Sequence, residues 1–123
     1  EAGSDESLKA HADQLATAAK LAIDATRAAG KRMAAGDVRL ALANASHYMT
    51  ALGHLTIGWL WLQQATIAQQ ALPNAAGDDR DFYAGKVQAC RFFFATELPL
   101  VEYHARLVRD AEASAFDMQI EWF

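Results

Sequence analysis

The stretch LALANASHYMTALGHLTIGWLWLQQATIAQQAL, residues 40–72, decides the fold of this chain. It contains no Asp, Glu, Lys or Arg, and only His47 and His54 titrate near neutral pH. Its centre, LTIGWLWL at residues 55–62, is apolar on every side of a helix. A helix that is hydrophobic all round is normally buried all round. We therefore expect the central helix of a bundle here, capped by Asp37 and ended near Leu72 by Pro73.

A helix of the ordinary amphipathic kind is expected before it, from about Ser4 to Ala35. Ser4 or Asp5 is a plausible N-cap, and basic residues in the last turn precede Gly36. One face of this helix should be buried and the opposite face charged. The apolar stripe consists of Leu8, Ala12, Leu15, Ala19, Ala22, Ala29 and Met33.

A third helical segment is expected from about Asp79 or Asp81 onward. Pro99 lies inside its pattern, and we predict a kink there, with the Ala95 carbonyl freed, rather than two separate helices. A second, adjacent stripe contains Phe93, Leu100 and Leu107. The main apolar stripe consists of Tyr83, Val87, Cys90, Phe94, Leu98, Val101 and Val108.

The fold class predicted from these segments is all-α, an up-down-up bundle of three long helices in a single domain, residues 1–123. The 28 alanines and 2 prolines fit close helix contacts. Two neighbours cover only about two-thirds of a central helix, so Trp59 or Trp61 should point at water. We therefore expect a partner domain or subunit to complete the bundle.

Composition excludes several classes of partner and location. The net charge is -4, with 11 basic and 15 acidic residues and no basic block, so we expect neither nucleic acid nor an anionic membrane as partner. The uncharged window 49–67 carries several Thr, Gln and His side chains that are costly in a bilayer, which disfavours a membrane span. A single cysteine, Cys90, cannot form an internal disulfide, so the cytoplasm is the expected location. The opening EAGSDES does not resemble a signal peptide, and Glu1 in place of Met indicates a piece of a longer protein.

Residues that could carry chemistry have simpler interpretations. His47 and His54 lie two helical turns apart, about 10 Å, too far for one metal ion, so each should be satisfied by a neighbouring helix or at an interface. Glu97 and Glu102 are about 140° apart on a helix and do not form an acid/base pair with each other. Cys90 lies on the apolar stripe and should be a buried small hydrophobe. We therefore predict no catalytic residue and no metal site.

Glycines and aromatic residues point instead to packing and association. Gly53 and Gly58 are mid-helix, where a missing side chain permits close approach of another helix. The triplet at 92–94 covers about 200° of helix surface, so one ring should face away from the core, as a core residue under the C-terminal segment or as an interface anchor. The interface candidates are Tyr48, His54, Trp59, Trp61, Phe92, Phe93, Trp122 and Phe123.

Two segments carry a specific pattern of aromatic, glycine and basic residues: SHYMTALGHLTIGWLWLQQA at 46–65 and DFYAGKVQACRFFFATELP at 81–99. They resemble the C-terminal helical domain of the acyl-CoA dehydrogenase family, and the similarity extends from about Leu8 to Phe123. The ending on an aromatic residue after an acidic stretch is similar too. The matching residues are Tyr48, Gly53, His54, Gly58, Trp59, Phe82, Tyr83, Lys86, Arg91, Phe92, Phe93, Phe94, Leu98 and Pro99.

The resemblance implies a parent flavoenzyme of fatty acid metabolism. Such an enzyme removes a proton and a hydride from an acyl-CoA thioester, FAD takes the hydride, and an electron-transfer flavoprotein is the usual acceptor. The family's catalytic glutamate and flavin site lie upstream, and no position here matches either. The chain is then an accessory, oligomerising domain whose partners are the rest of the dehydrogenase chain and further subunits. The alternative is a free-standing helical binding or adaptor domain that self-associates through the segment 40–72.

Overall fold

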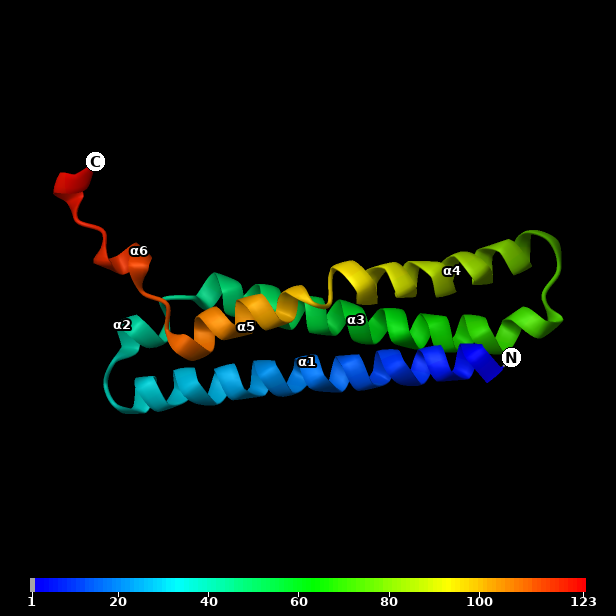
Figure 1. The fold of residues 1–123 in the computed structure, drawn as a ribbon, viewed down its shortest axis with the longest axis horizontal. Coiled ribbons are helices and arrows are strands. Elements are labelled where there is room, and N and C mark those ends of the chain that lie inside the picture. The colour runs from blue at the N-terminus through cyan, green and yellow to red at the C-terminus, as the bar shows by residue number, and fades with distance from the viewer. Residues whose placement is uncertain (1) are drawn as a thin grey trace.

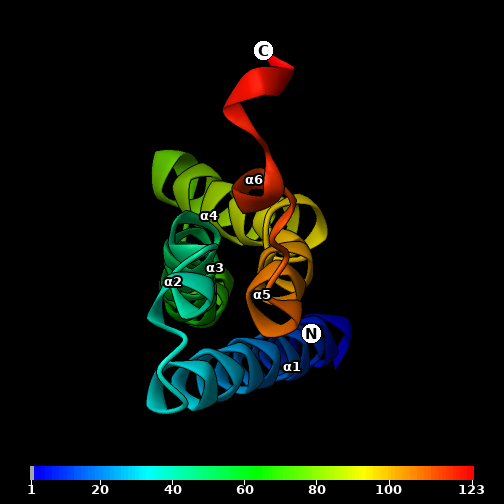
Figure 2. The ribbon, with the colours of Figure 1, turned by 90° about the vertical axis from the view of Figure 1, so that its left-hand side faces the viewer.

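A computed structural model describes the backbone of residues 2–123 and the side chains from Glu6 onward. Three long helical rods run up, down and up, and the last is made of two helices (Figure 1). Seen along the rods, α3 lies between α1 and α4, and α5 bridges α1 and α3 (Figure 2). The all-α, up-down-up prediction is confirmed. The helices are α1 (Ala2–Ala34), α2 (Val38–Ala41), α3 (Ala45–Ala71), α4 (Gly77–Thr96), α5 (Leu100–Asp110) and α6 (Ser114–Asp117), with short 3-10 turns at Leu72–Asn74 and Ile120–Trp122.

The turn from α1 into α2 is formed by Gly36 and Asp37, the residues that the sequence predicted at this helix boundary. Gly36 has a φ of +87°, and the amide of Asp37 donates to the carbonyl of Arg32, which closes the end of α1. The Asp37 side chain then accepts from the amide of Leu40 at 3.3 Å, so the predicted N-cap is confirmed. At the other end, α1 already includes Ser4 and Asp5, which corrects the predicted start. Their side chains lie outside the described residues.

The sequence predicted one helix from Asp37 to about Leu72, but the structure has two helices in this segment. A turn at 42–44 separates α2 from α3. The side-chain Nδ2 of Asn44 donates to the carbonyls of Leu107 and Glu112, at 3.2 and 2.8 Å, in the last turn of α5 and just beyond it. These long-range bonds tie the turn at Asn44 to the C-terminal end of α5.

The third rod is also divided, and the prediction of a single kinked helix is wrong. Helix α4 ends at Thr96 and α5 begins at Leu100. Pro99 has no N–H to donate, and the amide of Leu98 bonds to Phe93 O rather than to the next carbonyl, while Leu100 bonds to Glu97 O. Three consecutive residues therefore leave the α-helical pattern, which is enough to end one helix and start another.

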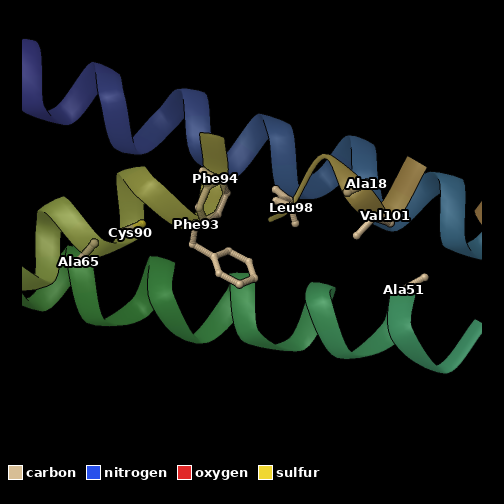
Figure 3. Close-up of a cluster of buried hydrophobic side chains, with 8 residues drawn as sticks. All are labelled: Ala18, Ala51, Ala65, Cys90, Phe93, Phe94, Leu98 and Val101. Atoms are coloured by element: carbon tan, nitrogen blue, oxygen red, sulfur yellow. The ribbon is translucent and has the colours of Figure 1, made fainter. Parts of the chain in front are cut away.

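The core lies where α1, α3 and the α4–α5 rod meet (Figure 3). Phe94, Val101 and Cys90 are its largest fully buried side chains, and all three lie on the predicted stripe. Val108 extends that stripe into a second, smaller cluster with Ala25 and Ala105 of α1 and α5. The principal cluster consists of Ala18, Ala51, Ala65, Cys90, Phe93, Phe94, Leu98 and Val101.

Small residues on α3 allow the three rods to approach closely. Ala51, Gly58 and Ala65 recur every seven residues on the inner side of the helix and are buried. A Cβ at Gly58 would lie 3.2 Å from Leu98 Cδ1 and 3.4 Å from Leu15 Cδ1, whereas one at Gly53 would meet nothing within 4 Å. The predicted close approach is therefore confirmed at Gly58 and wrong at Gly53.

Candidate interaction surfaces

The outer side of α3 carries large apolar side chains that the chain's own helices leave exposed. Met49, Leu60 and Ile67 are separated by 11 and 7 residues, which places them on one side of the helix, opposite the buried small residues. Met49 and Ile67 are 65% and 63% exposed. The small residues Ala51, Gly58 and Ala65 thus face the core, while these three large residues face away from it. The outer face is defined here as Met49, Ile57, Trp59, Leu60 and Ile67.

The two tryptophans of α3 have different surroundings. Trp59 is 51% exposed and belongs to the outer face. Trp61 packs against the core and lies under the ammonium group of Lys86, 5.4 Å from its ring centroid. The prediction that one of them points at water is confirmed for Trp59. The Lys86 ammonium group also lies 5.3 Å from the centroid of the Phe82 ring, so it makes cation–π contacts with two aromatic side chains.

The phenylalanine triplet divides as its helical spacing requires. Phe94 is 1% exposed, Phe93 is 8% exposed, and Phe92 is 62% exposed. Phe93, an interface candidate, is therefore used by the chain's own core, where its ring lies 6.4 Å from that of Phe94. Phe92 is the ring that faces away from the core. It remains available on the surface of α4.

The other interface candidates lie at the end of the bundle near α2. Tyr48 is half-buried against the second cluster, and its hydroxyl lies 3.0 Å from Thr26 Oγ1. Trp122 and Phe123 are 68% and 96% exposed in a C-terminal segment that leaves the bundle (Figure 1). Tyr48 thus helps hold α1 to α3, whereas Trp122 and Phe123 are free surface.

A histidine network connects α3 with α5. His47 Nδ1 lies 2.8 Å from His104 Nδ1, so one ring donates and the other accepts. His54 Nδ1 lies 2.9 Å from the Thr50 carbonyl, which can only accept, so this nitrogen carries a proton. His54 Nε2 faces a carboxylate oxygen of Glu97 at 3.4 Å. The prediction that His47 and His54 are satisfied by neighbouring elements is confirmed.

His104 lies between the other two histidines of this network. Burial lowers the pKa of His104, and the neighbouring His47 and His54 lower it further. The network spans two helices and the turn between α4 and α5. Sequence reasoning missed the role of His104, because its partner lies 57 residues away.

The remaining titratable candidates do not converge on one point. Glu97 faces His54, whereas Glu102 lines a groove against α1, near Asp13. Cys90 is fully buried, and burial raises the pKa of its thiol to about 11, so the prediction of a buried hydrophobe is confirmed. Among the residues that the structure describes, no three His, Cys, Asp or Glu side chains are grouped as a metal site requires.

Comparison with known proteins identifies the family to which this helical bundle belongs. The family described as acetyl-CoA dehydrogenase C-terminal like matches residues 1–119. The chain belongs to this family of acyl-CoA dehydrogenase C-terminal domains, which confirms the resemblance found in the sequence.

A relative with a described activity gives a second match. The broad-specificity linear acyl-CoA dehydrogenase FadE5 of Mycobacterium tuberculosis (strain ATCC 25618 / H37Rv) is 46% identical over 55 residues. These residues are 44% of this chain and 9% of that relative. Within the described part of the chain, none of the helices combines the length and hydrophobicity needed to cross a membrane.

Proposed function

We propose that this chain is the accessory, oligomerising domain of an FAD-dependent acyl-CoA dehydrogenase. The observation that carries the proposal is the outer face of α3, which holds five large apolar side chains and no charge. Covering the exposed half of each contributes roughly 1 kcal/mol per side chain before the costs of association. The partner surface is the body of the dehydrogenase, a second subunit, or both.

The chemistry of the parent enzyme comes with the family and is part of the proposal. The parent would remove hydrogen from the α and β carbons of an acyl-CoA thioester, with FAD as the hydride acceptor and an electron-transfer flavoprotein as the next acceptor. The parent would act in fatty acid metabolism in the cytoplasm. We assign no catalytic residue and no flavin ligand to this domain, because the histidine network is directed at its own members and at Glu97.

Truncation of the parent before residue 1 tests this function. We expect the shortened enzyme to keep its flavin and to form a smaller oligomer. The mass of the oligomer is measured by light scattering after gel filtration. A change in the kinetics with acyl-CoA would show that the domain also walls part of the substrate pocket. An unchanged mass together with unchanged kinetics would contradict the proposal.

A residue-level test uses Trp59→Asp in the same protein. A carboxylate at an apolar contact is left unpaired, so we expect weaker association than in the wild type. Ala16→Asp is the matched control, since it places the same carboxylate at an exposed position of α1. Equal, small effects of both variants would contradict an interface on the outer face.

The second candidate is a free-standing adaptor that self-associates through α3. Its support is that the chain closes two hydrophobic clusters of its own. This candidate predicts that the 123-residue chain forms a dimer or tetramer by itself. A strict monomer at high concentration would contradict it.

A further inference from the structure

The C-terminal segment, residues 114–123, combines exposed apolar side chains with negative charge. Every residue in it is exposed, and Ile120, Trp122 and Phe123 are 82%, 68% and 96% exposed. It contains two acidic residues, Asp117 and Glu121, and no basic ones. Large apolar side chains held this far out of a bundle are an unusual use of hydrophobic surface and indicate a docking segment.

A groove of complementary character lies at the end of the bundle from which this segment leaves. The end groove has a volume of about 170 Å³ between α1, α2 and the start of α3. Met33 and Leu42 on its wall are 46% and 53% exposed, so its apolar surface is open. A cavity of about 150 Å³ holds one benzene molecule. The end groove therefore has room for one aromatic ring.

Charge and hydrogen bonding fit the same pairing. The segment 24–44, which supplies most of the residues that line the groove, has four basic and two acidic side chains and so a net positive charge, whereas the charged residues of the C-terminal segment are both acidic. Thr26 Oγ1 donates to the Ala22 carbonyl at 2.7 Å, so the Tyr48 hydroxyl, 3.0 Å away, donates to Thr26. Tyr48 then keeps a lone pair free in the groove, which an indole N–H can use.

The segment of the same copy is directed away from this groove. The ring of Phe116 is held against α2, with the Arg39 guanidinium 4.8 Å from its centroid. Beyond that point the chain runs toward the side of the bundle opposite α1, as both views show (Figures 1 and 2). Helix α1 supplies one wall of the end groove, at 26–33. The occupant is therefore expected from another copy.

We propose that Trp122 of one copy docks in the end groove of a second copy, and that the exchange is reciprocal. The inference rests on the proposed function only in requiring that the chain self-associates. Each copy supplies one anchor and one groove, as a two-fold symmetric interface requires. The acidic segment then lies beside the net positive segment 24–44 of its partner.

Photo-cross-linking tests this contact directly. The probe p-benzoylphenylalanine replaces Trp122 in the full polypeptide that carries these residues, and isotopically heavy and light copies are mixed. We expect cross-links to residues 26–48, and they should join heavy to light copies. The same probe at Ser114, an exposed position in the same segment, is the control and should not reach the groove.

Variants of the groove sharpen the test. Leu42→Asp should lower the cross-link yield about tenfold or more, because it puts an unpaired carboxylate where an apolar ring docks. Ile23→Asp is the matched control, since Ile23 is similarly exposed, at 49%, and lies outside the groove. Unchanged helical circular dichroism of both variants verifies the fold.

The outcomes separate this inference from the proposed function. Cross-links within one copy, cross-links to another region, or no cross-link would overturn the docking of Trp122. The oligomeric mass is measured on the same sample. An oligomer with cross-links elsewhere would leave the proposed function intact, whereas a monomer would contradict the oligomerising role as well.

Discussion

The close packing of the three rods around Gly58 allows a quantitative prediction. Replacing a glycine in a helix interior by alanine stabilises the helix by about 0.5–1 kcal/mol, because alanine loses less conformational entropy than glycine when the chain folds. At Gly53 an added Cβ meets nothing within 4 Å, so Gly53→Ala should gain this amount. At Gly58 the same Cβ would lie 3.2–3.4 Å from Leu98, Leu15 and Phe93, closer than ordinary contact.

Overpacking of a core typically costs about 1–3 kcal/mol. Set against the propensity gain, this leaves Gly58→Ala between nearly neutral and about 2.5 kcal/mol less stable than the wild type. The two variants should therefore differ by about 1–3 kcal/mol in the free energy of unfolding, measured by urea denaturation followed by circular dichroism. If Gly58→Ala is stabilised as much as Gly53→Ala, then α3 does not approach Leu15 and Leu98 as described.

Three further predictions concern the core and its titratable groups. Phe94→Ala should cost about 3–5 kcal/mol of unfolding free energy by urea denaturation, whereas Phe92→Ala on the exposed side should cost far less in a monomeric sample; equal costs would contradict the assigned facing of the triplet. The lowered pKa of His104 means that the folded chain binds its proton less readily than the unfolded chain, so stability from this group is full above about pH 6.5 and falls as the pH drops below it. Thermal unfolding at about pH 7.5 and about pH 5.5 should show a smaller acid loss in His104→Gln than in the wild type, and an identical loss would refute the assignment. A pKa of about 11 for Cys90, against 9.0 for an exposed thiol, lowers the thiolate fraction about a hundredfold at pH 8, so alkylation by iodoacetamide should be at least that much slower in the native chain than in urea.

Local signals predicted much of this fold. The uncharged stretch at 40–72 identified the central rod, and the period of the third segment placed Cys90, Phe94 and Val101 in the core. Asp37 and Gly36 marked a helix boundary because capping depends on neighbouring residues alone. These features need no knowledge of the rest of the chain.

The features that sequence reasoning missed depend on long-range partners. The turn before α3 is fixed by side-chain bonds from Asn44 to carbonyls of Leu107 and Glu112, and nothing near Asn44 in the sequence reveals these partners. The break at Pro99 depends on the amide of Leu98 bonding to the Phe93 carbonyl. The effect of proline on a helix can be a kink or a break, and the local sequence does not distinguish the two. His104 pairs with His47 because α5 packs against α3, a contact between residues far apart in the sequence.

The interface candidates stay predictions, and the structure shows which of them are exposed. Trp59, Phe92, Trp122 and Phe123 are exposed as an interface requires, because their segments carry more apolar surface than one bundle can cover. Phe93 is buried instead, since the rotation of α4 about its axis is set by its contact with α3 and not by its own pattern.

The measurement that tests the central claim most directly is the mass and colour of the native polypeptide. An antibody against this chain would isolate the protein from its source, and intact mass and visible flavin absorbance would be recorded on that sample. The account predicts a yellow protein much larger than 13.4 kDa, the mass of these 123 residues. A colourless protein of 13.4 kDa would contradict the proposal that the chain is a domain of a dehydrogenase, and it would favour the free-standing adaptor.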